Sequence, residues 1–145
     1  MPLLVRFLGT AASRPTAERG VPSLALIRDG QTLLFDCGEG TQRQMMRYGV
    51  SFSVEDLFFT HTHSDHILGI TGLIRTMALQ GRTERLRLWA PRGAGKTLRQ
   101  CISLGGERTT FPVDITELDA GASLARGEYR IDTFAVDHGL SLIHI

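Results

Sequence analysis

Three of the five histidines in this chain stand within six residues, in the run HTHSDH at positions 61–66. Alternate side chains of an extended segment point to the same side, so His61 and His63 can offer two imidazoles to one ion. The start of a following helix turns Asp65 and His66 toward a second ion beside the first. Imidazole and carboxylate ligands favour zinc, and they also accept manganese or iron. The spacing therefore predicts a dinuclear metal centre.

Two simpler interpretations of the run stay open: a hydrophilic turn whose histidines bond to one another, or a mononuclear structural zinc site. Cys37 and Cys101 are too few for a disulfide framework and form no CxxC pair, so the metal hypothesis rests on histidine. A second candidate motif, the phosphate-binding P-loop, does not match. The segment RGAGKT at 92–97 ends like a P-loop, but Ala90 stands where that motif needs glycine, which favours a strand-to-helix turn.

The histidine run needs a strand before it and a helix after it. Residues 57–60 form a short apolar run that follows a capped turn at 53–56 and leads directly into the run. From His66 to about Gln80, apolar side chains recur at helical spacing, which predicts one amphipathic helix whose Ile67 to Ala78 face packs on the sheet. The metal-binding residues are thus expected at a strand-to-helix junction.

Further elements alternate along the rest of the chain. We predict strands at 3–8, 23–28, 31–35, 86–89 and 129–136, helices at 40–48 and 97–104, and a long exposed loop at 10–22. Asp29-Gly30 is typical of a tight hairpin turn between the second and third strands. The order of elements predicts a layered α/β fold with a mixed sheet.

The composition is that of an ordinary globular domain. A chain of 145 residues, with 42% hydrophobic and 21% charged residues, fits a single core. No apolar run is long enough to cross a bilayer and no secretory leader is evident, so we expect a cytoplasmic chain without a membrane partner. The net charge of +1 gives no global positive field that would indicate a nucleic-acid partner.

The run HTHSDH resembles the HxHxDH signature of the metallo-β-lactamase superfamily. Within that superfamily, FLGTAASRPTAERG, LLFDCGEGTQRQM and LFFTHTHSDHILGITGLI resemble segments of ribonuclease Z, the endonuclease that trims the 3′ end of precursor tRNA. The resemblance extends to about residue 139, whereas family members are about twice as long. It implies the N-terminal half of a metallo-β-lactamase αββα-type fold, with residues 1–145 forming a partial domain.

The resemblance also implies roles for particular residues. His61, His63 and His138 would bind one zinc ion, Asp65 and His66 would bind a second, and Asp65 would also be the general base. Asp36 resembles a buried acid that orients the metal-binding loop, although by residue type it is equally a helix N-cap. The remaining ligands belong to a second half of the family's chain. We therefore expect the isolated chain to be inactive and the full-length protein to act on precursor tRNA as a homodimer.

One loop departs from the family pattern. Ribonuclease Z often has a PxKxRN loop that helps reject a CCA terminus, and here the segment reads PTAERG at 15–20. Arg14 and Arg19 remain as candidates for RNA phosphate contacts, whereas Ala17 and Gly20 imply weaker rejection of CCA. Two other functions stay open: another hydrolase of the superfamily, arylsulfatase-like or a phosphodiesterase, and a non-catalytic zinc-binding fragment.

Overall fold

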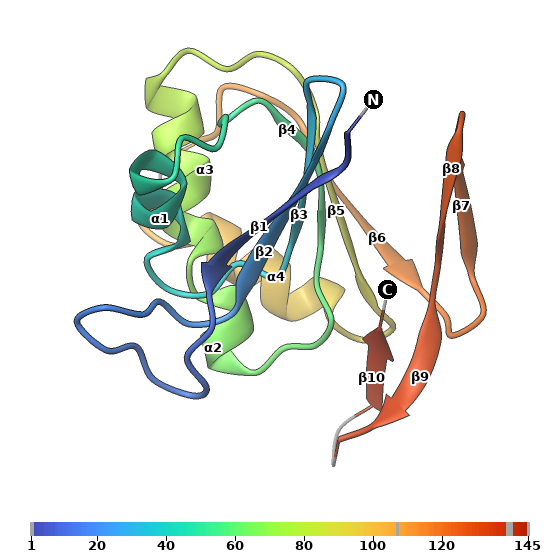
Figure 1. Ribbon diagram of the computed structural model, residues 1–145. Helices are drawn as coiled ribbons and strands as arrows, with labels where there is room; N and C mark the ends of the chain where they lie inside the picture. The colour runs from blue at the N-terminus through green and yellow to red at the C-terminus, as the bar shows by residue number, and fades with distance from the viewer. Residues whose placement is uncertain (1, 107, 139–140, 145) are drawn as a thin grey trace.

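A mixed six-stranded sheet forms the centre of the fold (Figure 1). The structure, a computed structural model, describes residues 2–106, 108–138 and 141–144. The sheet has the order β1-β2-β3-β4-β5-β6; its strands are β1 (Leu4–Gly9), β2 (Ser23–Arg28), β3 (Gln31–Phe35), β4 (Val54–Phe58), β5 (Leu86–Pro91) and β6 (Val113–Leu118). The first three pair antiparallel, and β3 to β6 run parallel. The predicted mixed sheet is confirmed.

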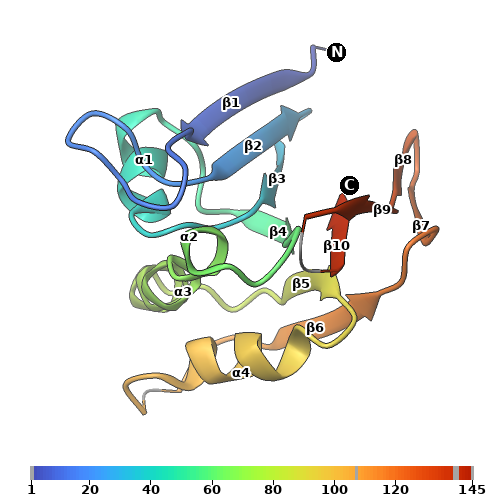
Figure 2. The same ribbon diagram turned by 90° about the horizontal axis from the view of Figure 1, so that it is seen from below.

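Four helices cover one face of this sheet: α1 (Thr41–Arg47), α2 (Ser64–Ile67), α3 (Ile70–Leu79) and α4 (Gly95–Ser103) (Figures 1 and 2). The main core lies between the two layers, where Leu34, Leu57 and Leu88 from the strands meet Ile70 and Leu73 from α3. Within the part of the chain that the structure describes, no helix is long and apolar enough to cross a membrane.

The opposite face of the sheet carries two small two-stranded sheets, β7 (Ser123–Arg126) with β8 (Tyr129–Asp132) and β9 (Phe134–Asp137) with β10 (Ser141–His144) (Figure 1). A second apolar cluster, formed by Leu33, Phe58 and Ile131, joins this layer to the sheet. The Phe58 ring stacks between the rings of Phe35 and Trp89, with centroids 5.1 and 6.0 Å away. The described residues thus form three layers, with helices on one face of the central sheet and small strand pairs on the other.

A buried carboxylate ties the β7–β8 hairpin to the sheet. Asp56 on β4 is fully buried and accepts hydrogen bonds from Arg87 at 2.8 and 2.9 Å and from the Trp89 indole at 2.6 Å. The Arg126 guanidinium of β7 lies 3.4 Å from the same carboxylate and 5.2 Å from the centre of the Trp89 ring. Burial opposes ionisation of Asp56, but the hydrogen bonds from Arg87 and Trp89 outweigh it and lower the pKa of Asp56.

The single helix expected from 66 to 80 is wrong, because α2 ends at Ile67 and α3 begins at Ile70. Gly69 packs directly on the loop after β3: its N–H donates to the Cys37 carbonyl at 2.9 Å, and a Cβ there would lie 2.0 Å from the Gly38 oxygen. This close approach interrupts the helix and leaves Leu68 52% exposed. Of the rest of the expected apolar face, Ala78 is partly buried and the other residues are buried, namely Ile67, Ile70, Leu73, Ile74 and Met77.

Other elements differ from the expectations. The turn expected at 53–56 is wrong, because β4 already begins at Val54, which pairs with Thr32 of β3. The strand expected at 129–136 is divided at Thr133, whose hydroxyl donates to the Asp119 carbonyl at 2.7 Å. The sequence did not predict β6 and β7, in which exposed positions recur along short strands. The other expected strands and both other helices are confirmed to within two residues at each end.

Candidate metal centre

The candidate ligands gather where strands end. The histidine run follows β4, an interior strand, and Asp36 follows its neighbour β3, so both lie at the carboxyl ends of parallel strands. The Asp36 N–H donates to the Phe58 carbonyl at 2.7 Å, which holds the Asp36 side chain beside the start of the run. His138 follows β9, on the other face of the sheet. Three segments far apart in the sequence thus meet at one place.

His61, His63 and His138 form one cluster. Each offers a ring nitrogen, and these three atoms lie within 4.8 Å of one another. His61 Nε2 is 2.9 Å from His63 Nδ1, and the His138 ring centre is 5.2 Å from that of His61 and 5.4 Å from that of His63. His61 is buried and His138 is exposed. Three imidazoles that leave one side open to solvent match a zinc site with a free fourth position.

The environment of His61 keeps it neutral. Burial, assisted by the charges of neighbouring histidines, lowers the pKa of His61 to about 4. A metal ion binds the neutral imidazole through a nitrogen lone pair. His61 is therefore in its ligand form near pH 7 without first losing a proton.

Asp36 and Thr60 orient the two inner rings. Asp36 is buried and accepts the Thr60 N–H and the Thr60 hydroxyl, both at 2.8 Å, and the His66 Nδ1–H at 2.7 Å. Because the Thr60 hydroxyl gives its only proton to Asp36, it accepts the Nδ1–H of His61 at 2.8 Å. In their neutral forms both His61 and His66 then carry the ring proton on Nδ1 and a lone pair on Nε2, as ligand imidazoles require. Burial opposes a charge on His66, but the hydrogen bond that His66 donates to Asp36 and the negative charge of Asp36 raise the pKa of His66.

Asp65 and His66 lie beside the cluster and not within it. The Asp65 Oδ2 atom is 3.6 Å from His66 Nε2, and it accepts the backbone N–H of Ser13 at 3.0 Å. The ring centres of His66 and His61 are 4.1 Å apart. Asp65 and His66 thus lie next to the three-histidine site. A second ion bound by these two residues would need further ligands. Among the described residues only the three histidines form a complete group of candidate ligands.

Sequence reasoning missed two residues of this site. Thr60 stands directly before the histidine run, and a hydroxyl at that position was the available signal. Ser13 gave no signal, because its contribution is a backbone N–H from a distant loop where it adopts a φ of 65°. The N-cap interpretation of Asp36 is wrong: the N-cap of α1 is Gly40. Arg14 and Arg19 are exposed on the loop that contains Ser13.

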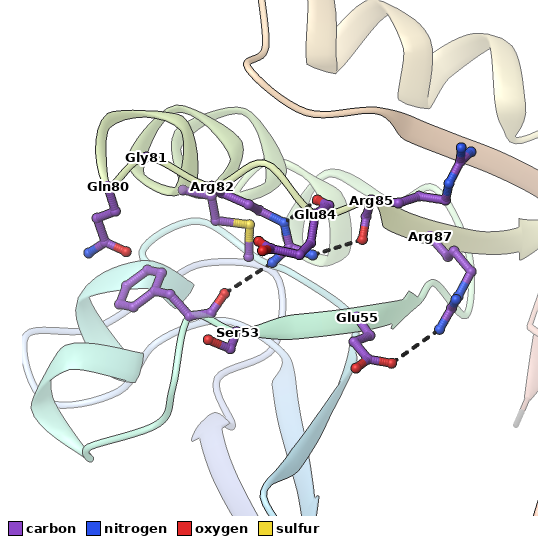
Figure 3. A pocket seen from close by; sticks show the side chains of 10 residues that line it. Ser53, Glu55, Gln80, Gly81, Arg82, Glu84, Arg85 and Arg87 are labelled. Atoms are coloured by element: carbon purple, nitrogen blue, oxygen red, sulfur yellow. Dashed lines mark hydrogen bonds and ion pairs between the residues drawn. The ribbon is translucent and has the colours of Figure 1, made fainter.

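A pocket of about 600 Å³ lies at the opposite end of the parallel strands, before β4 and β5 (Figure 3). Arg82 in this pocket donates to the backbone carbonyls of Phe52, Glu84 and Arg85. Arg87 is paired with Glu55 at 3.3 Å. These guanidinium groups already donate to partners within the protein, so the pocket offers a ligand fewer free N–H donors than its residue types suggest.

Replacing Asp36 with alanine is expected to lower the affinity for zinc by about 10- to 100-fold, because the rings of His61 and His66 lose the partner that orients them. Isothermal titration of the metal-free chain would measure this change. Glu39→Ala, which changes an exposed acid in the same loop, should leave the affinity unchanged. Equal affinities of the Asp36 variant and the unmodified chain would contradict the orienting role.

Comparison with solved structures defines the class of protein. The human tRNase Z, short form, is 27% identical with a TM-score of 0.84, and the match covers 96% of this chain and 62% of that one. The metallo-beta-lactamase fold protein YhfI from Bacillus subtilis is 17% identical with a TM-score of 0.81, covering 99% of this chain and 57% of that one. The chain therefore has the metallo-β-lactamase fold and comprises about half of it.

A family model described as "Anti-Pycsar protein Apyc1" matches residues 3–138, and the chain belongs to this family. Curated relatives of the chain are named Ribonuclease Z, which confirms the resemblance. That of Gemmatimonas aurantiaca is 79% identical over 139 residues, covering 95% of this chain and 44% of the relative. That of Myxococcus xanthus is 45% identical over 141 residues, covering 97% and 46%. The chain spans about half the length of the curated relatives it matches.

Proposed function

We propose that the full-length protein is a zinc-dependent endoribonuclease that removes the 3′ trailer from precursor tRNA. The observation that carries the proposal is the convergence of His61, His63 and His138 on one open point beside Asp65 and His66. The 79% identity to a Ribonuclease Z supports the choice of substrate. A cytoplasmic location and a homodimer of the full-length protein stay predictions.

The side chains have separable tasks in this proposal. His61, His63 and His138 would hold one zinc ion, and Asp65 and His66 would contribute to a second. Bound zinc lowers the pKa of water to near neutrality and stabilises negative charge on phosphoryl oxygens. Asp65, held by the Ser13 N–H, accepts the proton of the attacking water. Asp36 and Thr60 keep the imidazoles of His61 and His66 in the required tautomer.

The test is a cleavage assay of the full-length protein on precursor tRNA with a 3′ trailer. We expect cleavage that stops when a chelator removes the metal and returns when zinc is added. Aryl sulfates and cyclic nucleotides belong in the same assay, because the matching family model is not described as a ribonuclease. Turnover of these compounds with no cleavage of precursor tRNA would replace the proposal with another hydrolase of the same fold.

A further inference from the structure

An open groove of about 470 Å³ lies between the loop at 10–22 and helix α1. Arg19 lines it from the loop, and Arg43 and Arg47 line it from the helix; all three are exposed. Glu18 and Glu39 also border the groove. The groove therefore combines three cationic side chains with two acidic ones.

The arginines of this groove are not held in ion pairs by the residues that the structure describes. Within the described part of the chain, no carboxylate forms an ion pair with Arg19, Arg43 or Arg47. Several arginines elsewhere in the described chain do have carboxylate partners, namely Arg28, Arg85, Arg87, Arg92, Arg126 and Arg130. Guanidinium groups that line a groove without partners are available to the phosphates of a nucleic acid.

Exposed aromatic rings continue the groove. A second hollow of about 540 Å³ shares Arg19, Gly20 and Gln44 with the first and is lined further on by Phe7 and Tyr48. Phe7 is 64% exposed and Tyr48 is 37% exposed. The Arg47 guanidinium lies 5.5 Å from the centre of the Tyr48 ring. Exposed rings among unpaired arginines are typical of surfaces that bind single strands, where bases stack on the rings and phosphates contact the cations.

The two segments that line the groove continue directly into residues that contact the candidate metal centre. Ser13, on the loop that forms one wall, contacts Asp65 through its N–H. Glu39, on the other wall, follows Gly38. Gly38 packs so closely on the histidine run that a Cβ atom on Gly38 would lie 2.3 Å from the carbonyl oxygen of Asp65. The loop and α2 lie side by side in both views (Figures 1 and 2), and α1 borders the groove from the other side. A strand with a phosphodiester at the metal centre can therefore continue into the groove.

We propose that this groove binds the single-stranded 3′ trailer of the RNA substrate, with Arg19, Arg43 and Arg47 on phosphates and Phe7 and Tyr48 under bases. The trailer is chosen because base-paired RNA keeps its bases stacked within the duplex and cannot offer them to the rings. The inference rests on the proposed function and adds to it the path that the RNA takes beyond the scissile bond.

The test measures binding without cleavage. Fluorescence anisotropy would follow a labelled 12-nucleotide single-stranded RNA on the full-length protein in the presence of chelator. We expect R19Q/R43Q/R47Q to reduce the slope of log affinity against log salt by about 2, as loss of three phosphate contacts on a single strand requires. R19K/R43K/R47K should retain the slope. We expect Phe7→Ala to weaken binding by about fivefold or more.

Arg92→Gln is the matched control, because Arg92 is exposed but paired with Asp119 at 2.7 Å. An unchanged salt slope in the triple glutamine variant, or equal affinity for a duplex of the same length, would overturn the groove assignment whatever the cleavage assay shows. Groove-dependent RNA binding by a protein that does not cleave precursor tRNA would instead refute the proposed function and leave the groove as a single-strand site.

Discussion

Replacing both His61 and His63 with alanine is expected to lower the affinity of the chain for zinc by more than about 100-fold, a larger loss than removal of an orienting partner causes. The variant loses two of the three ring nitrogens that lie within 4.8 Å of one another. The remaining ligand, His138, is exposed, and a single imidazole does not hold the ion against water. Equilibrium dialysis followed by elemental analysis measures the bound metal directly.

The control for this variant is Thr62→Ala, which changes the residue between the two histidines and removes no candidate ligand of the cluster. Circular dichroism of both variants establishes that the fold is retained. Stoichiometric zinc on the double variant would show that the metal binds elsewhere and would remove the basis of the proposed function.

Asp65→Ala separates binding of the first metal ion from catalysis. The three-histidine site does not include Asp65, so we expect this variant of the full-length protein to keep its first metal ion. Cleavage of precursor tRNA should fall by about 100-fold or more, as removal of a general base requires. Unchanged cleavage would assign the proton transfer to another group.

Asp56→Ala is expected to have the largest effect on stability, a loss of about 3 kcal/mol in the free energy of unfolding. The substitution leaves the Arg87 and Arg126 guanidinium groups without their buried carboxylate and the Trp89 indole N–H without its acceptor. The loss lies at the lower end of the range for a broken buried pair, because Arg87 is partly exposed to solvent. Urea denaturation of the metal-free chain measures the change.

Asp114→Ala is the control for this prediction, because it removes an exposed partner of Arg85 beside the same strands and should cost no more than about 1 kcal/mol.

The effect of Asp56 also depends on pH. Its pKa is lowered in the folded protein, so its contribution is complete above about pH 4, the ordinary value of an aspartate, and is lost as the pH falls further. Equal losses for the two variants, or a difference that does not shrink in acid, would contradict the role of Asp56.

The sequence alone was sufficient where the interacting residues are close together along the chain. The spacing in HTHSDH predicts metal ligands because His61 and His63 lie in one extended segment, where side-chain direction follows from the backbone. The buried face of α3 follows from its helical period, and Asp29-Gly30 specifies the turn between β2 and β3. These features depend on local backbone geometry, which a short stretch of residues largely determines.

Other features depend on segments that meet only after folding. Periodicity could not reveal the break at Gly69, because its cause is the loop after β3 that packs against it. Asp36 and His138 were expected only through the family resemblance, since each stands on a different strand end from the histidine run. Three further features join residues that are 24 or more positions apart in the sequence. They are the hydrogen bonds from Thr60 to Asp36, the contact of Ser13 with Asp65, and the groove that Arg19 and Arg43 both line. The bond between Thr60 and His61 joins neighbours, but it depends on the one that Thr60 makes to Asp36. The tertiary structure decides such contacts because the packing of the sheet and helices, and not the local sequence, sets the distances between distant side chains.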